Sequence, residues 1–474
     1  MARINTNVAS LIAQQGLSNS QAALNKTLQR LSTGLRINSG ADDPAGLIAS
    51  ESLKSEIAGL QQAVSNSSQA INVISTADGA LSEVSSLLQD IKGLVVQSAN
   101  SGALSPAELQ ANQLQVDSAV QSITRIADST SFAGLHLLDG SLGYVTSGVT
   151  SAISALNISQ ANLGQQASIP VNINVISSAK LADLQFRASS ISQSTTLSIG
   201  GTDGVQTLSF VSGTTASAIA FAINNISDST GVKAALINSA TPTSGINFTS
   251  TGYGSASFVS IQAQSGAFNT TDTTGAAKSR AVGADAVATI NGATTVGSGL
   301  ELKLNTSTLD LDLTLNSSFG AGQTSFAITG GGALFQLGAQ VTSDQQVSIG
   351  IGSVAASSLG NNDVGFLNDI VTGGNSTLVG GKSEEASNII DAAITQVAVL
   401  RGSLGAFEAN TLQTNSDSLQ VALQNVTSSE STITDADFAA ETSNLTRSQI
   451  LVQAGTSVLA TANSTPQTVL KLLQ

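Results

Sequence analysis

The sequence predicts an α+β multidomain fold, with a long antiparallel α-helical coiled coil or bundle built from both chain ends and a β-rich central insert that contains a ββαβ unit. Three observations predict it. Apolar residues recur every three or four positions in both terminal regions, which is the spacing of one helix face. From about 173 to 381 the pattern changes to short period-two runs separated by Gly, Ser and Thr. Only five prolines interrupt the 474 residues, so long helices are permitted.

The N-terminal region is predicted to hold three helices. The second begins at Pro44, after Asp43 as its cap, and its apolar stripe from Ile71 to Val95 indicates a rod of roughly 85 Å if it reaches residue 100. The third begins at a Ser-Pro-x-Glu capping box at 105–108 and turns the chain back as a helical hairpin. The first helix carries leucines that step by four, three and four residues: Leu24, Leu28, Leu31 and Leu35.

The central region reads as strands. Leucines alternate with polar residues over 309–315, which predicts a strand with one apolar face. Asp310 and Asp312 lie on the other face, and a solvent-facing strand edge explains them better than a calcium site, because a calcium loop needs a Gly-containing turn that ends in Glu. Between Thr196 and Asn238 the pattern predicts two strands, a helix and a further strand.

The C-terminal region returns to the helical pattern. A stripe from Ile390 to Phe407 shifts by one residue before Leu412, which is typical of a stutter. Asp435 and Asp437 then precede a helix whose positive N-terminus they are expected to cap, a metal role being much less favoured. The last helix carries apolar residues at heptad intervals: Leu445, Val452 and Leu459.

Both outermost helices carry small residues beside these stripes, so each has little side-chain volume for a core of its own. Neither end should therefore be stable alone, and burial between copies of the chain is the expected solution. The expected assembly interface consists of the seven aliphatic residues of the outer stripes: Leu24, Leu28, Leu31, Leu35, Leu445, Val452 and Leu459.

The composition of the chain argues against most classes of catalytic, metal-binding and nucleic-acid-binding site. Lys and Arg total 17 against 31 Asp and Glu, and 17 minus 31 gives a net charge of −14, which disfavours binding to nucleic acid or to an anionic membrane. The chain has no Cys and one His, so thiol nucleophiles, Cys-ligated metals and two-His metal motifs are absent. His136 has no nearby triad partner, and the Gly-Lys-Ser at 381–383 lacks the first glycine of a phosphate loop. No catalysis, metal or cofactor is expected.

The opening residues MARINTNVAS have no basic segment followed by an apolar run, so no cleaved signal peptide is expected. Nowhere do about 18 apolar residues follow one another, so no membrane insertion is expected either.

Two segments resemble the ends of bacterial flagellin: LQRLSTGLRINSGADDPAGLIASESL, residues 28–53, and SNLTRSQILVQAGTSVLATANSTPQTVLKLL, residues 443–473. The resemblance extends over about 1–140 and 385–474, and the middle resembles only loosely the variable flagellin insert. It implies five parts, which are a core helix at 1–43 paired with a core helix at 435–474, a helical spoke at 44–172 and 385–434, and a central variable β-rich region at 173–384.

The resemblance implies a structural subunit that polymerises into the flagellar filament for swimming. Its implied place is extracellular, after unfolded type III export and assembly at the filament tip. The implied partners are other copies of the chain, an export chaperone on the C-terminal helix, and the filament cap and hook-junction proteins.

The family stretch that an animal innate receptor recognises resembles Gln89, Asp90, Lys92 and Leu94, together with Gln115. Asp90 stands where strongly stimulating members typically have arginine, and Gly93 replaces an acid. Because a reversed charge at an interface anchor commonly costs several kcal/mol, weak receptor activation is expected.

Two alternatives remain open at this point. A hook–filament junction protein shares similar helical ends, although the match at both termini favours the filament. A secreted adhesin would use the β-rich insert for binding, although the chain has two Tyr and no Trp with which to build an aromatic sugar platform.

Overall fold

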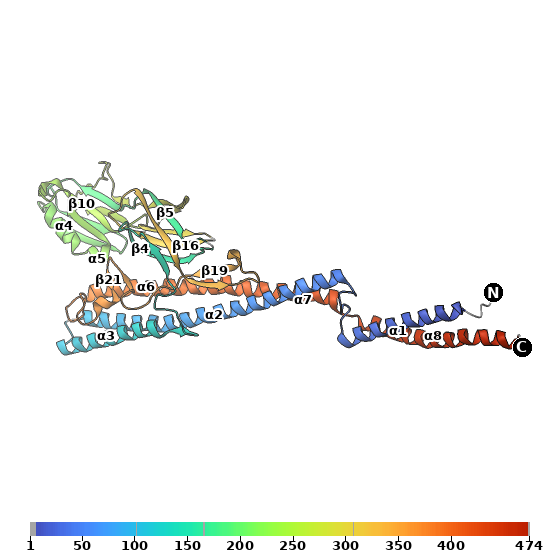
Figure 1. Ribbon diagram of the computed structural model, residues 1–474. Coiled ribbons are helices and arrows are strands. Elements are labelled where there is room, and N and C mark those ends of the chain that lie inside the picture. The colour runs from blue at the N-terminus through green and yellow to red at the C-terminus, as the bar shows by residue number, and fades with distance from the viewer. Residues whose placement is uncertain (1–5, 101, 165, 307, 473–474) are drawn as a thin grey trace. The chain divides into compact units, whose positions relative to one another are not determined.

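The computed structural model describes residues 6–100, 102–164, 166–306 and 308–472 (Figure 1). The chain divides into two compact units. The terminal unit comprises residues 1–68, 337–341 and 413–474, and the central unit comprises 69–336 and 342–412.

The terminal unit pairs the two ends of the chain. α1 (Val8–Thr33) lies antiparallel along α8 (Phe438–Leu472), with Asn7 Nδ2 donating to the Ala462 carbonyl at one end of the pair (Figure 1). The first part of α2 (Pro44–Ala99) and α7 (Thr414–Thr434) complete the unit. The antiparallel helical arrangement of the ends is therefore confirmed.

Two short linkers within the terminal unit are hydrogen-bonded to each other. Leu35 forms an antiparallel bridge with Asp435, and the Ala436 amide donates to the Gly34 carbonyl at 2.9 Å. The Arg36 amide likewise donates to the Thr434 carbonyl. The residues that follow α1 and the residues at the end of α7 are thus joined by backbone hydrogen bonds.

The central unit contains a helical bundle formed by the rest of α2, by α3 (Pro106–Ser129) and by α6 (Ser383–Phe407), which lie side by side (Figure 1). α3 starts at the predicted capping box, where Ser105 and Glu108 exchange hydrogen bonds. The predicted stripes lie in the core, where the buried residues include Ile74, Leu81, Leu88, Ile91, Val95, Val116, Val120, Ile123, Ile390, Val397 and Leu404.

The predicted register shift coincides with a π-helical segment, Glu408–Gln413, between α6 and α7. Phe407 and Leu412 are both buried although they are five residues apart, because the wider turn accommodates one additional residue. The shift is therefore a π-bulge within one continuous helix, Ser383–Thr434, which is called the helical rod below.

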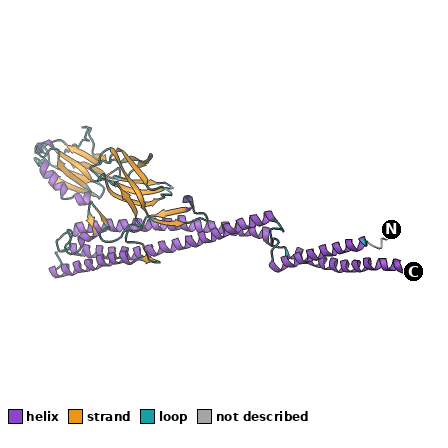
Figure 2. Cartoon of the chain, in the orientation of Figure 1, coloured by secondary structure: helices purple, strands orange, loops and turns teal. Residues whose placement is uncertain are grey.

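The strands form two β-bodies in the central unit (Figure 2). The first has a five-stranded sheet and a three-stranded sheet around a shared aliphatic core. Its sheets follow the orders β14-β13-β5-β17-β3 and β15-β16-β4, with β3 (Tyr144–Ser147), β4 (Ile153–Ala161), β5 (Ile169–Ser177), β13 (Val287–Ile290), β14 (Ala293–Val296), β15 (Glu301–Asn305), β16 (Leu309–Leu315) and β17 (Gly322–Gly331).

The second β-body confirms the predicted ββαβ unit. α4 (Ala216–Asn224) packs with two sheets around Phe248, Ile219 and Ile223. The sheet orders are β12-β11-β7-β8 and β6-β10-β9, with β6 (Leu181–Phe186), β7 (Thr195–Gly200), β8 (Val205–Phe210), β9 (Val232–Leu236), β10 (Ile246–Tyr253), β11 (Phe258–Ser265) and β12 (Arg280–Val282).

Shorter elements connect these parts. They are β1 (Ser131–Phe132), β2 (Leu135–His136), α5 (Ser227–Thr230), β18 (Ala333–Gln336), β19 (Gln346–Ile349), β20 (Gly360–Asn361) and β21 (Gly365–Phe366), with 3-10 turns at Pro242–Ser244, Ser343–Gln345 and Leu367–Ile370.

The β-rich region begins before the expected boundary at 173. β3 starts at Tyr144, and β4 and β5 contribute Ile158 and Val171 to the core of the first β-body. The residues of β4 are mostly Ser, Ala, Asn and Gln, so their alternation carries little hydrophobic contrast. This is why the sequence pattern did not reveal β4 as a strand.

The expected solvent-facing edge at Asp310 and Asp312 is wrong. β16 is the central strand of its sheet, between β15 and β4, and both carboxylates are half-buried. They border cavities between this sheet and the helical rod, with Lys303 and Val399 on the walls. Burial raises the pKa of both carboxyl groups, and Asp312 also raises that of Asp310.

By length and composition alone, the stretch Ser383–Thr434 is long and apolar enough to cross a membrane. In the structure α6 is paired to α2, because Arg401 Nε lies 2.8 Å from Asp78 Oδ1 and Lys92 contacts Asp391. Several apolar residues of α6, among them Ile390, Val397 and Leu404, are buried within the protein, and the absence of membrane insertion stays a prediction.

Candidate assembly surface

The paired outer helices expose a large amount of aliphatic surface. On α1, Leu11 and Ile12 both lie about one helical turn after Val8, and the three residues are 58%, 68% and 54% exposed, respectively. On α8, Ile450 is 61% exposed, and Leu28 of α1 is also exposed. Among the residues of α8 whose exposure the structure describes, Phe438, Leu451 and Val458 are further large exposed apolar residues. Contiguous apolar surface of this kind is typical of a protein–protein interface.

The seven residues predicted for the interface are placed differently from one another. Leu28 is 46% exposed, whereas the other six, Leu24, Leu31, Leu35, Leu445, Val452 and Leu459, are half-buried in the single chain. Sequence reasoning missed the stripe at Val8, Leu11 and Ile12, although its spacing of three and one is a helical pattern.

The α1–α8 pair has little core of its own. Of the residues whose burial the structure describes in these two helices, those that are buried are Thr27, Glu441 and Ser448. The helices approach closely at Gly455, where a β-carbon would lie 3.6 Å from the Cβ of Leu17. Such a pair gains little apolar burial from folding alone.

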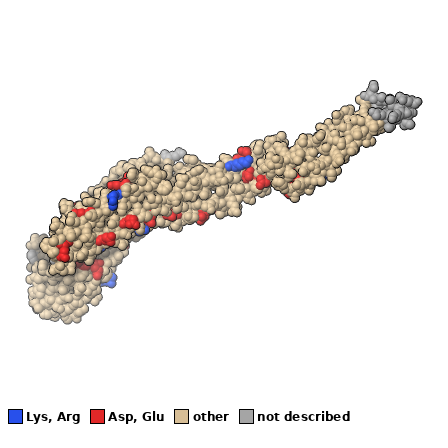
Figure 3. Space-filling view, turned by 90° about the horizontal axis from the view of Figure 1, so that it is seen from below, with Lys and Arg blue, Asp and Glu red and all other residues tan. Residues whose placement is uncertain are grey.

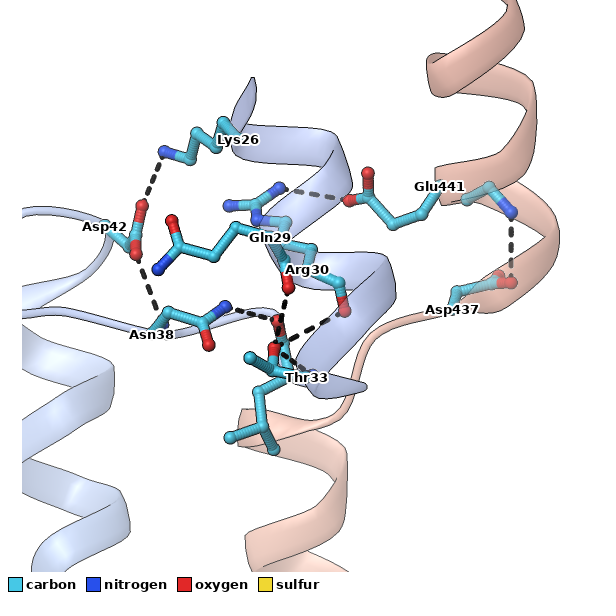
Figure 4. Close-up of polar contacts among 10 residues, drawn as sticks. Lys26, Gln29, Arg30, Thr33, Asn38, Asp42, Asp437 and Glu441 are labelled. Carbon is cyan, nitrogen blue, oxygen red and sulfur yellow. Dashed lines mark hydrogen bonds and ion pairs between the residues drawn. The ribbon is translucent and has the colours of Figure 1, made fainter. Parts of the chain in front are cut away.

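Two ion pairs lie at the base of the pair (Figure 4). Arg30 of α1 donates to Glu441 of α8 at 3.1 Å, and Lys26, one turn earlier, lies 2.7 Å from Asp42. The Lys26 ammonium, helped by the Asn38 amide, lowers the pKa of Asp42 to about 2. Asp437 Oδ1 accepts from the amides of residues 439 and 440, which confirms its expected capping role.

Asp435 does not take the expected place at the start of α8. It follows the last residue of α7, and its carboxylate accepts a hydrogen bond from Ser431 at 2.5 Å. Only Asp437 is close enough to the first turn of α8 to reach its free amides.

The receptor-like stretch lies on the bundle of the central unit. Gln89 and Asp90 of α2 and Gln115 of α3 are exposed. Leu94 is half-buried, and the Lys92 ammonium contacts Asp391 at 2.5 Å and also Ser387. The lysine is thus engaged within the chain, while the aspartate is presented to solvent.

The visible face of the molecule carries few charged side chains, and most of it is uncharged (Figure 3). Charged residues make up 10% of the sequence. Within the described part of the chain, no group of three or more His, Cys, Asp or Glu residues is placed to hold a metal ion.

Comparison with protein families matches both helical regions. Residues 4–143 match the bacterial flagellin N-terminal helical region, and 387–473 match the bacterial flagellin C-terminal helical region. Flagellin from Salmonella rubislaw is 32% identical over 509 aligned residues, with 99% of each chain covered. The chain belongs to the bacterial flagellin family. It is therefore a structural subunit of the flagellar filament, a component of the extracellular flagellum that serves motility.

Other flagellins agree. The B-type flagellin of Pseudomonas aeruginosa is 32% identical, again with 99% of both chains covered. Residues 196–252, which cover all but the first residue of the ββαβ unit, match the flagellin hook IN motif. Solved structures are more distant, with FliC from Burkholderia pseudomallei at 16% identity, 73% and 99% coverage of this chain and of FliC, and a TM-score of 0.25. FlgL from Xanthomonas campestris has 14% identity, 78% and 98% coverage, and a TM-score of 0.29.

Proposed function

We propose that the exposed aliphatic residues of α1 and α8 are the surface that neighbouring subunits bury in the flagellar filament. The observation that carries this proposal is the exposure of Val8, Leu11, Ile12 and Ile450 on a helix pair with almost no core. A pair of this kind is ordered by its neighbours, so a subunit without partners has flexible ends. The proposed interface also includes the seven predicted stripe residues.

The experiment compares three single substitutions of exposed apolar residues by aspartate. Ile12→Asp and Ile450→Asp lie on the outer helices, and Phe221→Asp, on the outer side of α4 at 69% exposure, is the matched control. An isoleucine side chain gains about 1.5–3 kcal/mol on burial, so the first two should raise the critical concentration for polymerisation roughly tenfold or more. Sedimentation of seeded filaments measures it. Equal behaviour of all three variants would refute the proposed surface.

We further propose the five-part division in which the pair 1–43 and 435–474 forms the filament core and 44–172 with 385–434 forms the spoke. The region 173–384 forms the projecting insert, whose first β-body also contains β3 and β4 from before residue 173. A proteolysis time course of assembled filaments tests this division, because the insert should be cleaved while both core helices stay intact. Early loss of residues 1–43 from intact filaments would contradict it.

We propose unfolded export through the flagellar type III channel without a cleaved signal peptide, followed by assembly at the filament tip beside the cap protein. Before export, a chaperone would cover α8, whose aliphatic residues Ile450, Leu451 and Val458 are exposed. The hook-junction protein would be the partner at the base of the filament. Mass spectrometry of secreted subunits tests whether the N-terminus is uncleaved. The chaperone is tested by co-purification: a small cytosolic protein should bind the full chain but not a chain that ends at residue 437.

We propose weak activation of the animal innate receptor, because Asp90 is exposed where a cation favours strong stimulation. Asp90→Arg should raise a reporter response, whereas Asp128→Arg, an exposed acid on α3, serves as the control. A wild-type response equal to that of a strong agonist would contradict this proposal.

We also propose that the chain has no enzymatic activity, since a cysteine-free chain with one histidine lacks the usual reagents. Metal-dependent proteolysis by purified filaments would overturn that.

A further inference from the structure

The paired outer helices have few large buried side chains with which to fix their longitudinal register. Buried positions on this pair are occupied by Thr27, Glu441 and Ser448, and the facing residues of α8 recur every three or four positions. In such a pair, a half-buried leucine meets an equivalent neighbour after a slide of one turn. Apolar packing alone therefore distinguishes poorly between neighbouring registers.

The ion pairs at the base of the helices do distinguish them. We propose that Arg30 and Glu441 are positioning residues that set the register of α1 against α8 in the filament, with Lys26 and Asp42 excluding one alternative. This inference rests on the proposed assembly surface. Glu441 is 7% exposed, and Arg30 has a buried Nε without a hydrogen-bond partner, so the guanidinium depends on its 3.1 Å contact with the carboxylate (Figure 4).

The first alternative register is the slide of α8 by one turn that brings Leu445, instead of Glu441, opposite Arg30. The guanidinium then faces an aliphatic side chain, and the Glu441 carboxylate loses its cation while it is still shielded from water. A buried charge without a partner is strongly unfavourable, so this register is disfavoured.

A slide in the opposite direction brings Glu441 toward Lys26, one turn before Arg30. Asp42 already holds that ammonium at 2.7 Å, so two carboxylates would share one cation. The same slide would break the hydrogen bond from the Ala436 amide to the Gly34 carbonyl. The two ion pairs, placed on consecutive turns of α1, therefore disfavour both neighbouring registers.

The chain has no cysteine, so introduced pairs of cysteines report the register without background. A β-carbon at Gly455 would lie 3.6 Å from the Cβ of Leu17, within the range that a disulfide requires, so Leu17→Cys with Gly455→Cys reports the observed register. Leu17→Cys with Val452→Cys or with Leu459→Cys reports slides of one turn. The measurement is the disulfide yield in pelleted filaments after mild oxidation.

With the native ion pair, the first cysteine pair should cross-link about tenfold more than either shifted pair, which is the ratio produced by about 1.4 kcal/mol. Arg30→Glu and Glu441→Arg should each reduce this preference to about threefold or less, and the double exchange should restore it. Glu441→Gln, which keeps the size and an acceptor oxygen, should give an intermediate ratio and serves where a charge reversal prevents polymerisation. The control exchanges Glu51 with Lys54, an exposed pair on α2, and should leave the ratio unchanged.

Unchanged cross-linking in filaments of Glu441→Gln and of the charge reversals would overturn the inference, and so would failure of the double exchange to restore the preference. Failure of the proposed assembly surface is a separate and recognisable result, because Ile12→Asp and Ile450→Asp would then polymerise as Phe221→Asp does.

Discussion

Deletion of one residue from the helical rod tests whether the π-helical segment Glu408–Gln413 contains one residue more than a continuous α-helix would need at this point. Deletion of Asn410, which is exposed inside the segment, should let the rod close into a continuous α-helix. Phe407 and Leu412, now four residues apart, then keep the positions they have in the core. The helix on each side of the deletion keeps its phase, so the free energy of unfolding should change by less than about 1 kcal/mol.

Deletion of Gly402, an exposed residue within α6, is the matched control. It removes the same number of residues, and the rod again closes into an α-helix, but residues 403–407 are displaced by one position. One position is about 100° of rotation, which turns Leu404 and Phe407 out of the core. Each side chain forfeits about 1.5–3 kcal/mol, so this deletion should cost about 3–6 kcal/mol.

The assay is urea unfolding of the full chain, followed by circular dichroism at the helical band because the chain has no Trp. Phe407 also faces Phe335 across 6.2 Å, a contact that only the control deletion should disrupt. If deletion of Asn410 lowers the free energy of unfolding as much as deletion of Gly402, the reasoning about the π-bulge is refuted.

Three further outcomes follow from local electrostatics and capping. The pKa of Asp42 is about 2 in the folded chain and ordinarily 3.8, so folding favours the charged form of this carboxyl group. Its contribution to the stability of the fold is therefore present above about pH 4 and is lost as the pH falls toward 2. Asp42→Asn should therefore flatten the acid limb of the thermal midpoint between those values, and an unchanged limb would contradict this. The pKa of Asp310 shifts in the opposite direction, because burial raises it and folding disfavours the charged form. The cost of this group to the stability of the fold therefore grows as the pH rises through the raised pKa. Asp310→Asn should raise the midpoint at pH 7 more than at pH 3, and an equal gain at both would count against it. Ser105→Ala removes the cap of α3 and should cost about 1 kcal/mol in urea unfolding, with exposed Ser118→Ala as the control for helix propensity.

Local signals made the helices predictable. The capping box at Ser105 and the stripe from Ile71 to Val95 need only residues within one helix, and the structure confirms both. The shift before Leu412 was also visible in the sequence. Whether such a shift is a coiled-coil stutter or a π-bulge depends on how the backbone accommodates it, which spacing does not specify.

Features that depend on distant partners were not predictable. β4 has weak alternation of its own, and it is a strand because β16 supplies its hydrogen bonds. The half-burial of Asp310 likewise follows from the central place of β16 in its sheet. Among the aliphatic residues of the outer helices, sequence spacing finds a stripe but cannot say which members α1 and α8 cover for each other. Val8, Leu11 and Ile12 emerged as exposed only from the pairing.

The backbone bridge between Leu35 and Asp435 has a consequence for evolutionary change. It joins positions that are 400 residues apart in sequence, using main-chain atoms that most substitutions leave intact. The β-rich insert, which lies between the two helical regions that match the family, can therefore lengthen, shorten or diverge while the ends still meet in the same way. The alignments with other flagellins run from 470 to 535 residues, so relatives of this chain differ in length.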